Sequence, residues 1–591
     1  MLPEVRLRRT PTHPMDSNKL WSYDPPPGHV IDQLAKDLSV SRFLANLLVQ
    51  RGITDPEKAE VFLSPRLKSL GDPLLLTNLE KASNRILSVI RENGEISILG
   101  DYDVDGVTST TLLVSFLKLF GNFPRFFVPR RLEEGYGMSR AVIKRAISAG
   151  TPSLFIALDC GTNSIQEVAY LRSLNVDVII IDHHQSTQET PEDCILVNPH
   201  IFDKKESPWL DLCTVGLVFK LIHGMVKILR DQGNEDAHQV QLKDYLDLVA
   251  LGTVADLVPL REENRVLVRH GLERLRQSTR CGIQALFQVS GLGIEGKELK
   301  SSDISFRLGP RINASGRLAD ATLPIEMLLS DNFQNSLQSA RQLDEMNTER
   351  QQIERSIVAE AEKMAMERYH DSHGIVVFNP SWHPGVVGIV ASRLTNILKK
   401  PSIVLGAEGT IAKGSGRSVL GVDLVKALTQ VEEMLVEFGG HPMAVGLSLE
   451  QVDLERFRAA FDASVEALLG DFDTTPALAI DSWVQPEDLG RDLLGELEKM
   501  HPFGQGNPEP VIGTRFLELA QRPQVFGEGG KNFRFQYFTP SGERISGISW
   551  KFEGSLPPAN VPLDLAFRFG WNHWNGNSYP QMEVLDWRLS S

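Results

Sequence analysis

Short apolar runs that end in acidic residues or histidine alternate with helical patterns in the first half of the chain. The run EISILG (95–100) leads into an acidic loop and then into an apolar helical stretch. The unit recurs where an apolar run ends at Asp159 before a helix that reaches Leu171, and where VDVIIIDHH (176–184) follows. This alternation predicts a parallel α/β sheet. Because ligands bind beyond the carboxyl ends of parallel strands, the side chains after these three strands are expected at one edge.

Other regions have different patterns. Residues 30–70 have the spacing of short helices, and residues 331–370 form a long, strongly charged helical stretch that we expect to connect two domains. A second α/β unit is predicted from HGIVVFNPSWHPGVVGIVASRL (373–394) to about residue 470. From Phe526 to Trp587 the chain is rich in aromatic residues that alternate with a period of two. That pattern predicts a small β-barrel or sandwich.

The composition fits a folded protein of several domains. At roughly 150 residues per domain, 591 residues predict about four domains. The net charge of −15 argues against coating nucleic acid by bulk positive charge, but it permits a local basic channel. No run approaches the roughly 18 apolar residues of a membrane helix, and the N-terminus lacks the apolar core of a secretory signal, so a cytoplasmic protein is expected. The cysteines form no CxxC pair and are interpreted as reduced structural thiols: Cys160, Cys194, Cys213 and Cys281.

The acidic loop GDYDVDG (100–106) is the first candidate for chemistry. Asp101, Asp103 and Asp105 alternate, so they share one face of an extended segment or surround a cation in a loop. Hard divalent ions prefer such carboxylate oxygens. The alternatives are a solvated acidic turn and a calcium loop. An EF-hand is unsupported, because the twelfth position of such a loop is Leu112 and not a glutamate.

Two further strand ends carry metal-type side chains. Asp159 follows the second apolar run, where the alternative is a helix cap. Asp182, His183 and His184 follow the third, and tandem histidines behind an aspartate favour a functional role. Imidazole together with carboxylates suits manganese and similar ions. Asp256, in ALGTVADLVPL, would by itself be interpreted as a turn.

Together, in this order, the four segments resemble the DHH phosphoesterase superfamily, and within it the RecJ single-strand-specific exonucleases. The resemblance covers roughly residues 75–590. Further stretches resemble the same branch: RRLEEGYG (130–137), GPRINASGRL (309–318), WHPGVVGIVASRL (382–394), GSGRS (414–418), GGHPMAVG (439–446) and PFGQGNPEP (502–510).

The resemblance implies an α/β fold class: a parallel-sheet DHH domain, a second, DHHA1-like α/β domain joined to it by a long helix, and a C-terminal OB-like β-barrel. The implied domains are an N-terminal helical segment (1–74), the DHH catalytic domain (75–330), the connecting helix (331–373), the DHHA1-like substrate-binding domain (374–474) and the OB-like single-strand-binding domain (475–591). In the last domain the alternating Phe533, Phe535 and Tyr537 are either core residues or rings that stack on bases.

The resemblance also implies the active-site residues and one or two Mn²⁺ or Mg²⁺ ions. It assigns one metal to Asp103 and Asp159, and the other to Asp105, Asp159, His183 and Asp256. His184 would act in catalysis with Asp159 and Asp103 by hydrogen-bonding the substrate or the attacking water, whereas Asp101 and Asp182 would orient ligands. Many relatives have a histidine ligand where this chain has Leu99, which predicts a weaker Asp103 site.

For the substrate, the resemblance implies a terminal 5′-phosphate on Ser415 and Arg417, joined by Arg131, with Arg311 and Arg317 on nearby backbone phosphates. The predicted function is 5′-to-3′ hydrolysis of single-stranded DNA to mononucleotides in DNA repair and recombination. The expected protein is a monomer that contacts no membrane and works with a single-strand-binding protein and a helicase. The alternatives are a phosphoesterase for oligoribonucleotides or other small phosphoesters, and an inactive relative that only binds nucleic acid.

Overall fold

The structure, a computed structural model, comprises two compact units. One unit holds Leu70–Thr474, and the other combines Met1–Ser69 with Thr475–Ser591. Among the described residues, no helix has both the length and the hydropathy that crossing a membrane requires. The described residues are 19–130, 134–135, 137–186, 188–293, 298–318, 321–369, 371–469, 477–550, 552, 554–574 and 577–590.

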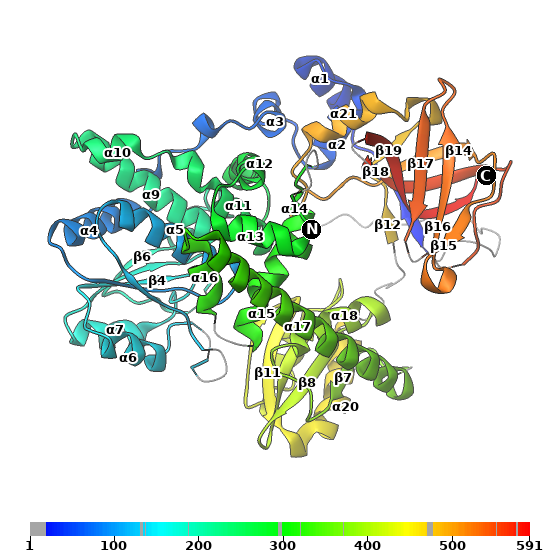
Figure 1. The fold of residues 1–591 in the computed structure, drawn as a ribbon. Helices are drawn as coiled ribbons and strands as arrows, with labels where there is room; N and C mark the ends of the chain where they lie inside the picture. Colours follow the sequence, from blue (N-terminus) through cyan, green and yellow to red (C-terminus); the bar gives the residue numbers. More distant parts are fainter. Residues whose placement is uncertain are drawn as a thin grey trace. The chain divides into compact units, whose positions relative to one another are not determined.

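The unit of Leu70–Thr474 contains a five-stranded sheet in the order β3-β2-β4-β5-β6, in which all neighbours are parallel (Figure 1). Its strands are β2 (Ile96–Leu99), β3 (Arg125–Phe127), β4 (Leu154–Leu158), β5 (Asp177–Ile181) and β6 (Ile195–Val197). β2 and β4 are buried along their whole length, as continuous apolar runs in a covered parallel sheet should be. The predicted parallel α/β sheet is confirmed.

Helices cover both faces of this sheet (Figure 1). α6 (Arg140–Ser148) and α7 (Ile165–Ser173) lie on one face, where their apolar side chains join those of β4 and β5 in one cluster. α4 (Leu79–Arg91), α5 (Val104–Leu119) and α9 (Thr214–Asp231) lie on the other. The carboxyl ends of β2, β4 and β5 therefore open between two helical layers.

A helical region then leads to a long connecting helix. Its helices include α11 (Leu246–Ala255), α12 (Glu262–Arg276), α13 (Cys281–Ser290), α15 (Gly309–Leu318) and α16 (Thr322–Leu329). The connecting helix is α17 (Phe333–Arg368), which runs for 36 residues. The predicted long helix between the two α/β parts is confirmed.

The second α/β part is a mixed sheet in the order β10-β11-β9-β8-β7. β7 and β8 are parallel, and the other neighbours are antiparallel. Its strands are β7 (Ile375–Phe378), β8 (Ser402–Glu408), β9 (Ile411–Arg417), β10 (Glu437–His441) and β11 (Ala444–Glu450). α18 (Val387–Leu398) packs with α17 on one face, and α19 (Leu424–Thr429) packs with α20 (Leu454–Leu469) on the other.

The unit that joins the two ends of the chain is built on a seven-stranded sheet in the order β13-β14-β18-β19-β17-β16-β15. Its strands are β13 (Ser482–Val484), β14 (Ile512–Glu518), β15 (Gln524–Phe526), β16 (Asn532–Phe538), β17 (Arg544–Ser549), β18 (Pro562–Trp574) and β19 (Asn577–Leu589). On β16, Phe533, Phe535 and Tyr537 are 1%, 7% and 9% exposed. Of the two interpretations of these rings, core packing is the one that the structure supports.

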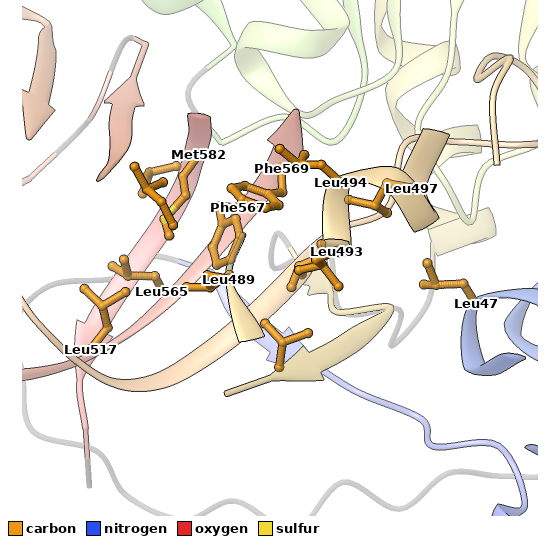
Figure 2. Packing of buried hydrophobic residues seen from close by; sticks show 14 of the residues in the cluster. Leu47, Leu489, Leu493, Leu494, Leu497, Leu517, Leu565, Phe567, Phe569 and Met582 are labelled. Atoms are coloured by element: carbon orange, nitrogen blue, oxygen red, sulfur yellow. The ribbon is translucent and has the colours of Figure 1, made fainter. Parts of the chain in front are cut away.

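The N-terminal helices belong to this same unit. They are α1 (Gly28–Leu38), α2 (Arg42–Gln50) and α3 (Pro56–Leu63), and α21 (Arg491–Lys499) joins them in one apolar cluster with the sheet. Figure 2 shows leucines of α21 between Leu47 of α2 and the rings of Phe567 and Phe569 on β18. In addition, β1 (Leu20–Ser22) pairs with β12 (Ala477–Ala479). The sequence pattern had not linked these two ends of the chain.

Candidate metal centre and phosphate pocket

The loop after β2 places its aspartates at the start of α5. Asp103 is the N-cap of this helix, where its carboxylate accepts a hydrogen bond of 3.1 Å from the backbone N–H of Gly106. A Cβ at Gly106 would lie 2.5 Å from the carbonyl oxygen of Asp101, so the loop can fold back on the helix only because this residue is glycine. The helix-capping geometry thereby directs Asp103 and Asp105 to the edge of the sheet.

Asp105 is buried against the N-terminus of α9. Its two carboxylate oxygens accept backbone hydrogen bonds of 2.7 Å from Thr214 and 2.8 Å from Val215. These N–H groups have no partner within their own helix, and the positive end of the helix dipole favours a carboxylate there. A contact between residues more than a hundred positions apart therefore fixes the Asp105 carboxylate.

Asp159 follows β4 in a left-handed backbone conformation, with a φ of 65°. Its buried carboxylate accepts a hydrogen bond of 3.0 Å from the Thr214 hydroxyl. A left-handed φ is uncommon for a residue with a side chain and persists where surrounding contacts impose it. Here the backbone conformation turns the carboxylate towards Asp105 and the end of β5.

His183 is the point at which the predicted ligands meet. Its Nε2 lies 3.4 Å from Asp159 Oδ1, 3.5 Å from Asp256 Oδ2 and 3.9 Å from Asp105 Oδ2. Nε2 of His183 and Oδ2 of Asp256 are buried and have no hydrogen-bond partner. These two buried polar atoms have no partners and face one another among carboxylates. A divalent cation bound between them would supply the missing interaction.

The electrostatics of the cluster also fit a cation. Burial, reinforced by neighbouring carboxylates, raises the pKa of Asp105 to about 7 and that of Asp256 to about 9. The same causes raise the pKa of Asp159 well above its usual range. Burial lowers the pKa of His183 to about 4, which keeps its imidazole neutral, the form that binds metals. A bound divalent ion would allow these carboxylates to ionise together.

We expect the metal-free protein to lose stability as the pH rises from about 5 to about 9. In this window the folded chain binds more protons than the unfolded chain, because the folded-state pKa values of Asp105 and Asp256, about 7 and about 9, exceed the ordinary value of 3.8. Stability is therefore fully present at acidic pH and is lost as these carboxyls are forced to ionise. Thermal unfolding in a chelator should show a midpoint that falls with pH, and Mn²⁺ should raise the midpoint most at high pH.

The Asp256→Asn variant is the control for this prediction. It removes one of the carboxyls with a raised pKa but shares every other titrating group with the wild type, so it should show a shallower fall of the midpoint. Equal pH dependence in the two proteins would contradict the prediction.

Asp182 and His184 form a second hydrogen-bonded group beside the cluster. The Asp182 carboxylate accepts bonds from His184 Nδ1 at 2.7 Å and from the Thr162 hydroxyl at 2.7 Å. Burial opposes the charge of Asp182, but its hydrogen bonds and the histidine charges outweigh burial and keep its pKa well below the usual range. Burial likewise opposes protonation of His184, yet Asp182 raises its pKa to about 9. Asp182 thus orients His184 and holds it protonated, with its Nδ1 engaged.

Among the described residues, the carboxylates, histidines and one thiol form three groups, two of which share a residue, and within each group the ligand atoms lie within 4.8 Å of one another. The groups are Asp101, Asp103 and Asp159; Asp159, His183 and His184; and Asp105, Cys213 and Asp256. Asp159 is shared by two groups, as the predicted bridging role requires. Leu99 is buried in the apolar cluster under the sheet, so it adds no ligand on the Asp103 side.

A cavity of about 390 Å³ lies beside Asp103, between the two α/β parts of the same unit. Its lining includes Tyr102, Asp103, Asn313, Arg317, Gly385, Gly388, Ser415 and Arg417. Ser415 and Arg417 alternate along β9, and a Cβ at Gly388 of α18 would lie 3.3 Å from the Ser415 hydroxyl. Glycine in α18 therefore keeps the space in front of these two side chains open.

Arg417 is a half-buried cation in this cavity. Burial lowers the pKa of its guanidinium, and in the described part of the chain no carboxylate forms an ion pair with it. Its Nη1 donates a hydrogen bond of 2.8 Å to the carbonyl of Gly416. A desolvated guanidinium without a carboxylate partner is a favourable site for an anion such as phosphate.

The other predicted substrate residues differ in their placement. Arg317 lines the cavity and donates to the Gly385 carbonyl at 2.9 Å. Arg311 does not line it: Nε pairs with Asp344 at 2.8 Å, and Nη1 donates to the Arg307 carbonyl at 2.6 Å. Arg131 lies outside the described residues. The structure places Ser415, Arg317 and Arg417 at the cavity, and the phosphate-binding roles of these residues and of Arg311 and Arg131 stay predictions.

Sequence reasoning missed several residues of the centre. Thr214 holds both Asp105 and Asp159, and Cys213 lies beside Asp105 and Asp256. Asn313 lines the cavity with a buried side-chain oxygen that has no partner. Cys213 and Thr214 lie at the start of α9, far along the chain from the acidic motifs, so no sequence spacing linked them to the metal centre. Asn313 lies in GPRINASGRL (309–318), one of the stretches that resemble the RecJ branch, so this signal could have identified it.

Three family models match the chain. They are the DHH family N-terminal domain over residues 95–253, the DHHA1 domain over residues 371–467 and the RecJ OB domain over residues 480–586. A relative from Bacillus subtilis, the "single-stranded-DNA-specific exonuclease RecJ", is 33% identical over 584 residues, which cover 97% of this chain and 71% of the relative.

Solved structures of RecJ proteins are also similar to this chain. The crystal structure of RecJ from Thermus thermophilus in complex with Mn²⁺ matches with a TM-score of 0.78 and 28% identity, covering 97% of this chain and 80% of that one. The Mg²⁺ complex from the same organism matches with a TM-score of 0.74 and 27% identity, covering 97% and 79%. Both of the ions predicted from the sequence therefore occur in structures with this fold.

Proposed function

The chain belongs to the RecJ family of single-stranded-DNA-specific exonucleases, and from this premise we propose that it hydrolyses single-stranded DNA from the 5′ end to 5′-mononucleotides, with Mn²⁺ or Mg²⁺ as cofactor. The observation that carries the proposal is His183 Nε2 facing three carboxylates next to a cavity that contains a half-buried arginine. In the cell, this activity belongs in the cytoplasm, in repair and recombination, beside a helicase and a single-strand-binding protein.

We propose that some of the side chains at the site bind the cations and that others bind the substrate. Bound divalent ions supply an activated water and neutralise charge on the phosphate oxygens. We assign Asp105, Asp159, His183 and Asp256 to one ion, and Asp103 with Asp159 to a second. Asp182 engages Nδ1 of His184 and orients the ring, and we propose that the imidazolium donates a hydrogen bond to the scissile phosphate. Because Asp182 keeps His184 protonated, that donation is charge-assisted.

The charge of a phosphorylated chain end distinguishes it from an internal position. A terminal phosphate monoester carries about −1.5 to −2 charges near neutral pH, more than an internal phosphodiester. We propose that Arg417 and Ser415 hold this terminal phosphate in the cavity beside Asp103, with Arg317 of the same lining on a nearby backbone phosphate. The half-buried guanidinium of Arg417 binds the more highly charged group more strongly, so a 5′-phosphorylated end is favoured over an internal phosphodiester and the next phosphodiester reaches the metal centre.

A single strand carrying a 5′-phosphate and a label at one end tests the function. With Mn²⁺, a 5′ label should be released at once as a mononucleotide, whereas a 3′ label should remain on progressively shorter strands. Blunt duplex should resist. Degradation that starts at the 3′ end, or equal cutting of duplex, would contradict the proposal. Faster turnover of short oligoribonucleotides than of long DNA would favour the small-phosphoester alternative.

A further inference from the structure

A thiol lies among the acidic residues of the metal centre. Cys213 directly precedes α9 and is buried, and its sulfur lies within 4.8 Å of ligand oxygens of Asp105 and Asp256. The cysteine forms no disulfide. Its Sγ also lies 3.5 Å from the hydroxyl of Thr253. The centre thus offers one sulfur atom together with its oxygen and nitrogen atoms.

The position of this sulfur relative to Asp105 is fixed by the backbone. The two residues after Cys213, Thr214 and Val215, donate their backbone N–H groups to the two oxygens of Asp105 at 2.7 and 2.8 Å. The thiol and the carboxylate are therefore anchored to the same helix start. Oδ1 of Asp105 also accepts a hydrogen bond of 3.5 Å from the Ser109 hydroxyl, whereas Oδ2 accepts the Thr214 bond and retains a lone pair for a cation.

Independent atoms point to a cation at the same place. Oδ2 of Asp256 is buried without a hydrogen-bond partner, and so is Nε2 of His183, 3.5 Å away. Two such atoms that face each other form a site suited to a positive ion. Cys213 is close enough to share that ion with Asp256 and Asp105.

The mixture of sulfur and oxygen has a consequence for metal selection. Mg²⁺ and Mn²⁺ prefer oxygen ligands, whereas thiolates select softer ions of the zinc class. We propose that Cys213 is a thiolate ligand for soft divalent ions, which bind at Cys213, Asp105 and Asp256 and displace Mn²⁺ or Mg²⁺. A metal–sulfur bond forms, the thiol proton passes to the solvent, and no group is oxidised or reduced. The inference rests on the metal centre of the proposed function and adds an inhibitory class of ion to it.

Cadmium is the probe, because a cadmium–thiolate bond absorbs in the ultraviolet and bonds to carboxylate or imidazole do not. Metal-free full-length protein is titrated with Cd²⁺, and the difference absorption is recorded for the wild type and for Cys213→Ser. Serine is a favoured residue at a helix N-terminus, so this variant should fold. Cys194→Ser and Cys281→Ser are the matched controls, because both cysteines lie partly exposed and outside the cluster.

The wild type and both control variants should develop the thiolate band with one equivalent of Cd²⁺, and Cys213→Ser should not. Asp256→Asn retains the thiol but should weaken Cd²⁺ binding by at least about tenfold, because it removes a shared ligand. A band of full strength in Cys213→Ser, or no band in the wild type at saturating Cd²⁺, would overturn the inference. Because the readout is spectroscopic, a chain without nuclease activity still gives a clear answer, and the two proposals fail separately.

Discussion

Replacing Asp159 with asparagine should lower the turnover of single-stranded DNA by at least about a thousandfold. Asp159 belongs to two of the three candidate ligand groups and lies 3.4 Å from His183 Nε2. Asparagine has the same shape and can still accept the hydrogen bond of Thr214, so the fold should persist while one of the negative charges that hold the cations is lost. Steady-state hydrolysis with saturating Mn²⁺ measures the effect.

Asp177→Asn is the matched control for this substitution. Asp177 lies at the start of β5 and pairs with Arg85 and Arg172, away from the metal centre. Its replacement should change turnover by no more than about twofold, since surface ion pairs contribute little. DNA binding by Asp159→Asn should remain measurable. More than a tenth of the wild-type turnover in Asp159→Asn would contradict the assigned role.

Replacing Arg417 with alanine should lower kcat/KM on 5′-phosphorylated single strands by about a hundredfold. The guanidinium is half-buried in the cavity, and truncating one member of a desolvated, charged pair costs about 3 kcal/mol. That free energy corresponds to about two factors of ten. The loss should be much smaller on strands with a 5′-hydroxyl, because they lack the group that Arg417 binds. Kinetics on the two substrates in parallel measure the difference.

Lys413→Ala on the same strand is the control for Arg417. Lys413 is a half-exposed cation of β9 that pairs with Glu408 and does not line the cavity. Its loss removes the same charge from β9 without touching the cavity, so both substrates should be affected little and equally. If Arg417→Ala lowered kcat/KM equally on 5′-phosphate and 5′-hydroxyl strands, Arg417 would not be the residue that recognises the terminal phosphate.

Local patterns predicted the parts of the site that lie at strand ends. The apolar runs before Asp101, Asp159 and Asp182 are strands in the structure, and they are parallel neighbours. Parallel strands necessarily present their carboxyl ends at one edge, so the convergence of Asp105, Asp159 and His183 followed from the order of the elements. Asp256 directly follows α11, outside this sheet, and only the family resemblance placed it with them.

Alternating aromatics left an ambiguity that burial resolved. A period of two shows that Phe533, Phe535 and Tyr537 share one face of a strand, but it does not show whether this face meets the core or the solvent. The structure places all three rings in the core. For Arg311 the sequence pattern likewise gives a charge but no contacts; in the structure its Nε pairs with Asp344 and its Nη1 donates to the Arg307 carbonyl, and its phosphate-binding role stays a prediction.

The sequence by itself determined the order of strands and helices, the parallel sheet and the acidic and histidine residues at its edge, because periodicity and strand ends are properties of neighbouring positions. Only the tertiary structure decided that α9 begins against Asp105, that Cys213 joins the metal centre, and that the N-terminal helices share a core with the C-terminal sheet. These contacts join residues from about fifty to several hundred positions apart. No local pattern encodes them, because burial and packing select such partners only when the whole chain is folded.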